Sequence, residues 1–156
     1  MVNSGVSRLS DDEFLQVIRN TPLVSVDLIV RNPRDEVFLT FRKNQPAKSF
    51  WFVPGGRILK DETIDRAFRR IVETDLRLHK DFKAAHFLGV FEHFYRENKF
   101  ENPEFGTHYV VLAYAIKISE TLELAATHEH AGYKWLSVSD LLRDAEVHPN
   151  TKGFFL

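Results

Sequence analysis

The chain has 156 residues, of which 44% are hydrophobic and 28% charged, and its net charge at neutral pH is -1. This length and composition are typical of one soluble globular domain spanning residues 1–156, and the charge balance gives no basic excess for a nucleic-acid partner. The absence of cysteine excludes disulfide and thiolate chemistry, and no apolar run approaches the ~20 residues of a membrane helix. Because residues 1–10 lack the apolar core of a signal peptide, we expect a cytoplasmic protein with no membrane partner.

The first predicted element is a short helix at about residues 10–20. Ser10 and Glu13 have the spacing of a capping box, which satisfies the free N–H groups of a first helical turn. Apolar residues then recur at helical spacing at Phe14, Val17 and Ile18. Thr21-Pro22 ends the helix, because proline cannot continue it. We expect this helix to pack by its apolar face.

An apolar strand is predicted over residues 23–30, with Asp27 inside it. Turn residues follow it, and the next apolar run, over residues 37–41, is its predicted hairpin partner. Further predicted elements are strands over residues 86–94, 109–118 and 133–136 and a closing helix over residues 139–143. The polar stretch 96–106 is typical of a surface loop that can close over a ligand.

The main predicted helix follows a glycine-rich segment. Its apolar stripe has helical spacing and consists of Ile64, Ala67, Phe68, Ile71 and Val72. The charged residues that accompany the stripe are Glu62, Arg70, Glu73 and Asp75. We interpret Gly55-Gly56 as a turn that lets the backbone approach a ligand, and the helical carboxylates as a row that faces a divalent cation. The stretch therefore predicts a phosphate and metal site.

The spacing of this stretch resembles the Nudix box, in which a Gly is followed after five residues by a Glu and after seven more by R-E-U-x-E-E-x-G-U, with U aliphatic. The positions that fit are Gly56, Glu62, Arg70, Val72 and Leu78. The positions that depart are Ile71 and Thr74 in place of Glu, Asp75 in place of the second Glu of the pair, and Arg77 in place of Gly. The resemblance implies the Nudix fold, an α/β (α+β) architecture with a mixed β-sheet sandwiched between α-helices.

The rest of the chain resembles one branch of that superfamily, the GDP-mannose mannosyl hydrolases. The likeness covers about residues 9–156 and is carried by TPLVS at 21–25, WFVPGGR at 51–57, KDET at 60–63, HFY at 93–95, THYVV at 107–111 and YKW at 133–135. It implies an enzyme that hydrolyses a nucleotide sugar, with GDP-mannose giving GDP and mannose as the first expectation. It also implies a homodimer.

A metal site follows from the same resemblance, for Mg²⁺ or, as an alternative, Mn²⁺. Its ligands fall at the Gly55 carbonyl, Asp75 and Glu129. Asp75 is one methylene shorter than the Glu of the family, and Glu129 carries a charge where the branch has a neutral Gln. Such oxygen ligands suit a hard divalent cation, which keeps several waters and neutralises the charge of a diphosphate.

Water attacks the anomeric carbon of the sugar in this branch, and a histidine is the general base. The resemblance assigns that role to His130, and the neighbouring His128 is a rival. An imidazole suits the role because its ordinary pKa of about 6.5 leaves it largely neutral at pH 7 and able to accept a proton.

The departing GDP develops negative charge on its β-phosphate, so cations aimed at that group favour its departure. The resemblance assigns Arg42 and Arg57 to the diphosphate or leaving group. Arg70, the arginine of the box, is expected to orient carboxylates by ion pairing, or only to pair with its neighbours on the helix.

Three further residues are implied as parts of the site. Tyr109 is placed near the phosphates, although packing in the core is an equal alternative. The resemblance places Asp27 near the sugar or the departing group. Independently, a carboxylate inside an apolar strand needs a partner if it is buried. His93 is implied as a secondary site residue.

Other functions fit the same residues. A pyrophosphatase that acts on nucleotide sugars or nucleoside diphosphates would use the same metal and attack phosphorus, with Glu62, Arg70 and Glu73 in support. The sugar could be glucose or fucose instead of mannose. A catalytically weak domain that only binds nucleotide is the alternative from a different class.

Overall fold

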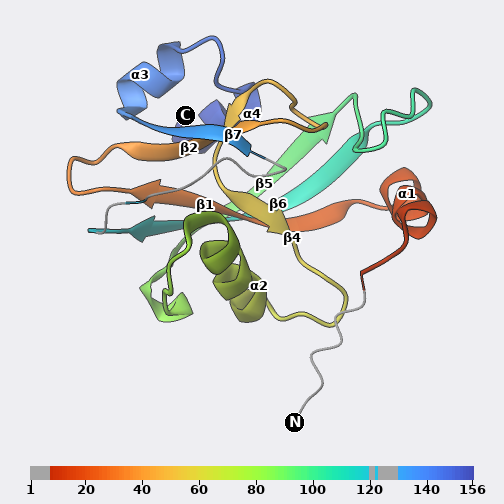
Figure 1. Ribbon diagram of the computed structural model, residues 1–156, viewed down its shortest axis with the longest axis horizontal. Coiled ribbons are helices and arrows are strands. Elements are labelled where there is room, and N and C mark those ends of the chain that lie inside the picture. The colour runs from red at the N-terminus through yellow and green to blue at the C-terminus, as the bar shows by residue number, and fades with distance from the viewer. Residues whose placement is uncertain (1–7, 120–121, 123–129) are drawn as a thin grey trace.

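The computed structural model describes residues 8–119, 122 and 130–156, with His130 described by its main chain only. Figure 1 shows a mixed β-sheet with helices on both sides. Its strands are β1 (Leu23–Arg31), β2 (Val37–Arg42), β3 (Trp51–Phe52), β4 (Gly55–Arg57), β5 (His86–Tyr95), β6 (Thr107–Lys117) and β7 (His130–Leu136). The order across the sheet is β3-β2-β1-β6-β5, with β4 paired to β1 and β7 paired to β2. The central β1–β6 pair is parallel.

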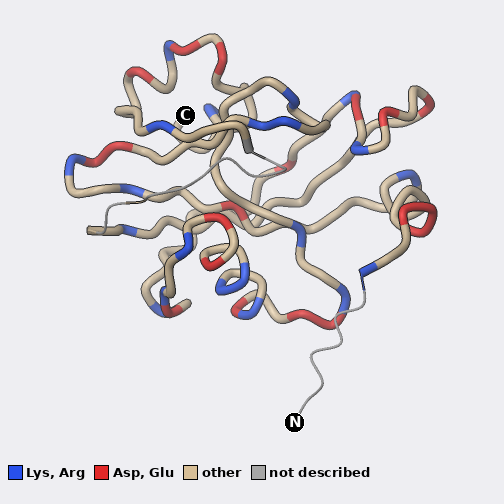
Figure 2. Tube along the Cα trace, viewed as in Figure 1, with Lys and Arg blue, Asp and Glu red and all other residues tan. Residues whose placement is uncertain are grey.

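Helices cover both faces of this sheet. They are α1 (Asp11–Asn20), α2 (Ile64–Ile71), α3 (Val138–Arg143) and α4 (Pro149–Lys152), with short turns η1 (Val72–Leu76), η2 (Phe82–Ala84) and η3 (Gly153–Phe155). Figure 1 shows α2 below the sheet, α3 and α4 above it, and α1 at one end. Within residues 8–119, 122 and 130–156, no helix is long and apolar enough to cross a membrane. Acidic and basic residues are interspersed along the chain (Figure 2).

Strand β1 is the centre of the fold because both of its faces are buried. Val26, Leu28 and Val30 pack against α2 in one apolar cluster. Ile29 points to the opposite face and belongs to a second cluster, which lies under α3 and the C-terminal residues. A strand covered on both faces has a nearly continuous apolar sequence, and residues 23–30 have that sequence.

Strands β1 and β2 diverge from the turn that connects them. Near the turn, Arg31 lies opposite Val37. Farther from it, β1 is paired by β4 and β2 is paired by β3, so the short segment from Trp51 to Arg57 crosses from one strand to the other. The crossing is fixed at its middle by the Leu28 N–H, which donates to the Pro54 carbonyl at 2.8 Å. The fork opens on the side where the predicted site residues gather.

The predicted fold is confirmed, and so are the predicted helices and strands, with boundaries shifted by a few residues. The capping box of Ser10 and Glu13 is present at the start of α1. The loop predicted at 96–106 connects β5 to β6.

The predicted glycine turn is wrong. Gly55 and Gly56 lie in β4, where they pair with Asp27 and Val26, and α2 begins only at Ile64. A three-residue strand with two glycines shows no side-chain alternation, so the pattern could not reveal it. Strand β3 and helix α4 were also missed. The apolar stripe of α2 is covered except at Ile64, which is 39% exposed.

Helix α2 continues into a π-helical turn, η1, that ends at Leu76 and has Arg77 as its C-cap. Arg77 has φ 54° and ψ 36°, the left-handed region, and its N–H donates to the Glu73 carbonyl at 3.0 Å. This is the position where the Nudix box has Gly, the residue that adopts this conformation without strain. The side chain of Arg77 is exposed, so a bulky residue is tolerated there at a cost in backbone energy.

We expect Arg77→Gly to raise the free energy of unfolding by about 0.5–1 kcal/mol, because removing the strain outweighs the added freedom of the unfolded chain. Urea denaturation measures the change. Arg77→Ala is the matched control, since it removes the same side chain and keeps the strained conformation. Equal stabilities for the two variants would contradict the interpretation.

Candidate functional site

Two adjoining cavities lie at the fork between β1 and β2. The larger is a cleft of about 290 Å³ and the smaller a hollow of about 70 Å³. The residues that line both are Arg42, Pro46, Gly55, Gly56, Arg57 and Tyr109. The cleft adds the predicted residues Arg70 and Asp75, and the hollow adds Asp27 and His93. Most of the predicted site residues therefore come together around one opening.

The remaining predicted residues lie elsewhere. Glu62 sits behind the cleft with its side chain 4% exposed, and Glu73 is exposed on η1 and lines neither cavity. The main chain of His130 starts β7 opposite Arg42, which brings it to the same edge of the fork. Glu129 and its neighbour His128 lie outside the described residues.

The hollow occupies a gap between two apolar clusters along one face of β1. Leu23, Ser25, Asp27 and Ile29 alternate onto this face. Leu23 packs with α1, and Ile29 packs in the cluster under α3. Between them Ser25 and Asp27 line the hollow. Neighbouring β6 places only the small side chain of Ala113 beside Asp27, which leaves room there.

Asp27 is a buried carboxylic acid, with 6% of its surface exposed. Burial raises the pKa of its carboxyl from 3.8 to about 7, because the charged form loses its hydration. Two smaller effects oppose this shift. The Ser25 hydroxyl donates to Oδ1 at 3.0 Å, and the guanidinium of Arg42 favours the charged form. The group is thus poised between protonation states near neutral pH.

Gly55 is required by its neighbour. A Cβ at residue 55 would lie 2.6 Å from Asp27 Oδ1 and 2.9 Å from the Val26 carbonyl oxygen. No side chain fits between β1 and β4, so the close approach of the two strands depends on glycine here. At Gly56, by contrast, a Cβ would make ordinary contact with Ile71 at 3.5 Å.

Glu62 and Arg70 connect α2 to β4. The Nε and Nη2 groups of Arg70 donate to the two carboxylate oxygens of Glu62 at 2.7 and 2.9 Å. Nη2 also donates to the main-chain carbonyl of Arg57 at 2.9 Å. These hydrogen bonds lower the pKa of Glu62 and raise that of Arg70. Glu62 and Arg70, which fit the pattern of the box, thus hold the strand that carries Arg57.

Arg42 and Arg57 keep their positive charges available. Arg42 Nε donates to the Pro46 carbonyl at 2.9 Å, and the guanidinium of Arg57 lies 4.2 Å from the centroid of the Phe14 ring. Burial lowers the pKa of Arg57, although an arginine stays protonated at any ordinary pH. Among the described residues neither arginine forms an ion pair with a carboxylate.

His93 forms the apolar back of the hollow. It is 4% exposed and its ring packs on Phe52 and Phe154, with centroid distances of 6.0 and 5.3 Å. Burial is the main cause that lowers the pKa of His93 to about 4, and the nearby His148 is a smaller one. His93 is therefore neutral at physiological pH and packs the wall of the hollow.

Several lining residues were missed by the sequence reasoning. They are Arg8, Phe14, Ser25, Pro46 and Lys99. Ser25 carried a signal, since it stands two positions before Asp27 in an apolar strand and therefore on the same face. No sequence signal pointed to Phe14 as a site residue, because a phenylalanine on the apolar face of a helix indicates packing and nothing more.

The molecule is thus a forked mixed sheet with α2 packed against it and a cleft beside both. A family model described as NUDIX domain matches residues 21–155, and the chain belongs to this family. Nudix hydrolases act on nucleotide-derived substrates and generally use a divalent cation such as Mg²⁺.

Individual relatives agree with the family assignment. The chain is 38% identical over 123 residues to the low-salt glycan biosynthesis protein Agl8 of Haloferax volcanii, which covers 78% of this chain and 76% of Agl8. A MutT NUDIX hydrolase of Burkholderia pseudomallei has a TM-score of 0.70 and 22% identity, over 86% of this chain and 96% of that one. The NUDIX domain of Shewanella oneidensis NrtR, solved with ADP ribose, has a TM-score of 0.66 and 18% identity, over 94% of this chain and 96% of that one. At these identities the two structures show a shared fold.

The described donors suit Mg²⁺. The main chain of Gly55 and the carboxylate of Asp75 both line the cleft. In the described part of the chain no group of three or more His, Cys, Asp or Glu side chains gathers as a cage. Mg²⁺ rarely needs one, because it keeps waters and is usually held by one or two carboxylates together with substrate phosphates.

We expect the buried Asp27 to make folding stability fall as pH rises. Its pKa is higher in the folded than in the unfolded chain, so its contribution is fully present below pH 4 and is lost as pH rises to about 7. The loss is on the order of 4 kcal/mol. Asp27→Asn should remove this decline, measured as urea unfolding at a series of pH values with a chelator present.

Asp12→Asn, which changes an exposed acid of α1, is the control and should leave the decline in place. An unchanged pH profile in Asp27→Asn would show that folding does not raise the pKa of Asp27.

Proposed function

We propose that this protein is a Mg²⁺-dependent hydrolase of a nucleotide sugar, with GDP-mannose and water giving GDP and mannose. One observation carries the proposal. Arg42 and Arg57 line both cavities beside Gly55 and Gly56, and neither forms an ion pair with a carboxylate among the described residues. A diphosphate at this boundary would have one substituent in the hollow and the other in the cleft. The likeness of the chain to the GDP-mannose mannosyl hydrolases supports the choice of substrate.

In this proposal the residues of the chain bind the diphosphate and move one proton. Arg42 and Arg57 donate hydrogen bonds to the phosphates and stabilise the negative charge of departing GDP. Tyr109 lines both cavities and donates to the same phosphates, and Asp27 faces the group held in the hollow, beside the neutral wall formed by His93. The Gly55 carbonyl, Asp75 and Glu129 would hold Mg²⁺, which neutralises diphosphate charge when bound. His130 accepts the proton of the attacking water.

Attack at carbon is favoured over attack at phosphorus by the side chains that α2 and η1 present to the cleft. They are Arg70, Ile71, Thr74 and Asp75. Glutamates that assist attack at phosphorus would stand at residues 71 and 74, and Ile71 and Thr74 cannot take a proton from water there. Glu62 is occupied by Arg70. A general base from another element is therefore needed, and His130 starts the strand opposite Arg42.

Hydrolysis of GDP-mannose with Mg²⁺ in ¹⁸O-labelled water tests the reaction. We expect the label in mannose, read by mass spectrometry of both products, because attack at the anomeric carbon breaks the bond between that carbon and oxygen. Label in a phosphate, with GMP as product, would instead establish a pyrophosphatase. No turnover of GDP-mannose or of GDP-glucose and GDP-fucose would leave a domain that binds nucleotide without hydrolysing it.

A variant of the proposed base gives a second test. We expect His130→Gln to lower kcat by about 10²–10⁴-fold with little change in KM, as for the loss of a general base. His128→Gln should retain most of the activity. His79→Gln is the control, since His79 is exposed and lines neither cavity. If His128→Gln is the inactive variant, the base has been assigned to the wrong histidine.

A further inference from the structure

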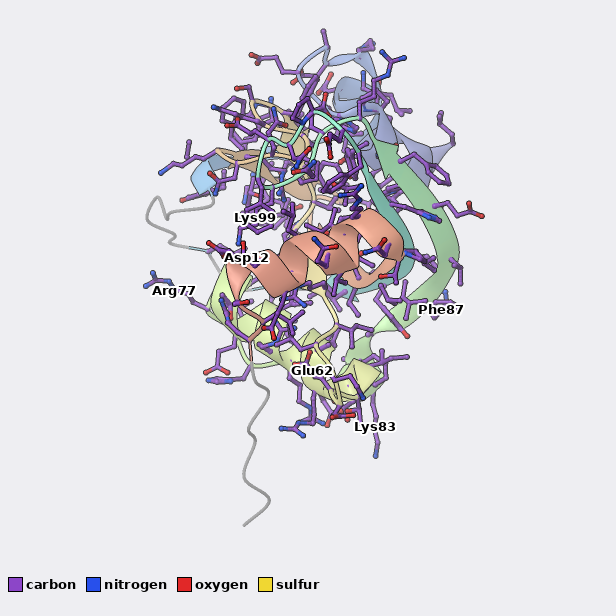
Figure 3. All side chains as sticks on the ribbon, turned by 90° about the vertical axis from the view of Figure 1, so that its right-hand side faces the viewer. Asp12, Glu62, Arg77, Lys83, Phe87 and Lys99 are labelled. Carbon is purple, nitrogen blue, oxygen red and sulfur yellow. The ribbon has the colours of Figure 1, made fainter. Side chains whose placement is uncertain are left out.

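Helix α1 precedes the part of the chain that matches the family, yet it forms a wall of the cleft. The family match begins at residue 21, and α1 ends at Asn20. Phe14 and Ile18 of α1 line the cleft together with Arg57 and Lys99. Figure 3 shows α1 lying across the molecule, with Asp12 and Lys99 labelled at the same end of the helix. An element outside the matched domain thus contributes to the site.

The contact between α1 and the site is a ring against a guanidinium. The Cζ atom of Arg57 lies 4.2 Å from the centroid of Phe14, and the ammonium of Lys99 lies 5.7 Å from the same centroid. Both distances are within the ~6 Å over which an aromatic face attracts a cation. Phe14 is itself 9% exposed, so its ring is held by the protein.

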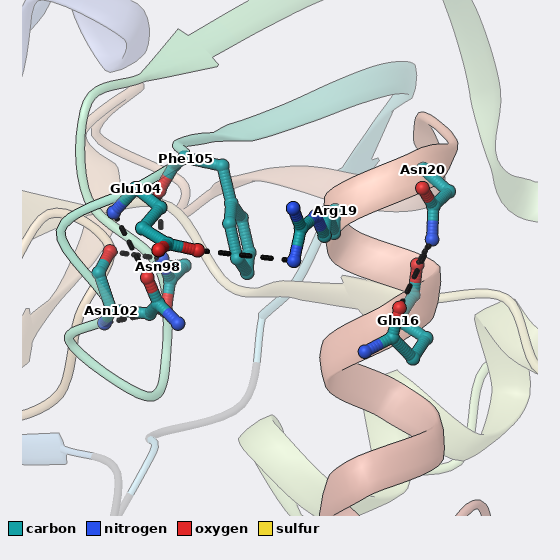
Figure 4. A network of polar contacts seen from close by, with 7 residues as sticks. All are labelled: Gln16, Arg19, Asn20, Asn98, Asn102, Glu104 and Phe105. Carbon is teal, nitrogen blue, oxygen red and sulfur yellow. Dashed lines mark hydrogen bonds and ion pairs between the residues drawn. The ribbon is translucent and has the colours of Figure 1, made fainter.

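Phe14 is fixed by a cluster that joins α1 to the 96–106 loop. Its apolar members are Phe14, Ile18, Leu23, Val17, Phe100, Phe105 and Tyr109. Phe100 meets the Phe14 ring edge-on at a centroid distance of 6.0 Å. At the other end of the helix, Arg19 pairs with Glu104 at 3.8 Å and lies over the Phe105 ring at 5.8 Å (Figure 4).

The loop is rigid enough to support this cluster because of one buried amide. Asn98 has no exposed surface, and its Nδ2 group donates to the carbonyls of Asn102 and Phe105 at 2.8 Å each. Its Oδ1 accepts from the N–H groups of Phe100 and Asn102. Figure 4 shows this network facing α1. The loop and α1 therefore hold Phe14 between them.

We propose that Phe14 is a positioning residue that holds the guanidinium of Arg57 in the orientation that binds the substrate diphosphate. A ring face is suited to this because it restrains the plane of the guanidinium and accepts none of its N–H hydrogen bonds. A carboxylate in the same place would occupy two donors and cancel the charge. With Phe14 beneath it, Arg57 keeps its N–H groups and its charge for a phosphate. The proposal rests on the proposed function, since it requires that Arg57 meets a phosphate ligand.

Binding of GDP, measured by calorimetry with Mg²⁺ present, tests this role. We expect Phe14→Leu, which keeps an apolar side chain and removes the ring, to raise the Kd for GDP about 3- to 10-fold, in the range of a partly desolvated cation–π contact. Phe14→Tyr keeps the ring face and should bind within 2-fold of the original protein. Phe105→Leu is the matched control, because it removes a ring from the same cluster that does not contact Arg57.

The decisive comparison places Phe14→Leu in an Arg57→Gln background. If Phe14 acts through Arg57, the same change should alter the Kd for GDP less than 2-fold there. A loss of equal size in both backgrounds would mean that Phe14 only packs the helix, and the proposal would be wrong. Because Phe105 belongs to the cluster that holds Phe14 but does not contact Arg57, Phe105→Leu should raise the Kd for GDP less than Phe14→Leu does.

A readout without ligand separates this proposal from the proposed function. The ring current of Phe14 should shift the Arg57 side-chain protons upfield in the NMR spectrum, and Phe14→Leu should abolish the shift. If the protein binds no GDP but the shift is present, the choice of substrate fails and the positioning of Arg57 stands. Absence of the shift would overturn the positioning itself.

Discussion

The site depends on how closely β4 approaches β1 at Gly55 and Asp27. A side chain at residue 55 would collide with the Asp27 carboxylate and with the Val26 carbonyl, so the spacing is possible only with glycine. The approach has two consequences. It covers Asp27 and raises its pKa by desolvation. It also directs the chain from β3 across the fork, which sets Arg57 at the boundary of the two cavities. The same contact therefore places an acid and a cation on one opening.

The box residues act mainly behind this opening. Arg70 bridges Glu62 and the Arg57 carbonyl, so the helix and β4 are tied by hydrogen bonds to a nearly buried carboxylate. Charge-assisted hydrogen bonds of this kind are stronger than neutral ones. In this chain the box is thus a scaffold for β4 as well as a surface of the cleft, which is why Glu62 and Arg70 fit the pattern while residues 71 and 74 can depart from it.

The fold could be predicted from the sequence further than the site could. The apolar runs and the stripe of α2 gave the strands and the main helix, because core burial imposes periods of two and 3.6 residues. Strand β4 was not predicted, because its two glycines have no side chains that could alternate between apolar and polar. For the candidate site, the family pattern predicted Arg42, Arg57 and Asp75, which line the cleft. It missed Phe14, whose ring meets Arg57 only through the docking of α1, a contact between residues far apart in the chain. Tertiary contacts of this kind leave no local signal.

Three of the arginines that line the cleft, Arg42, Arg57 and Arg70, differ in what holds them, and this bears on the departures from the box. Arg70 is neutralised by Glu62, whereas Arg42 is held by a carbonyl and Arg57 by an aromatic ring. Carboxylates at residues 71 and 74 would face the same cleft and cancel part of the charge of Arg42 and Arg57. In the proposed reaction, their absence would leave more positive potential for a diphosphate and no glutamate at residues 71 and 74 to assist attack at phosphorus. The departure from glutamate at residues 71 and 74 and the lack of ion pairs at Arg42 and Arg57 among the described residues are thus one electrostatic feature. In the proposed reaction, this feature would favour stabilising a departing diphosphate over activating water beside it.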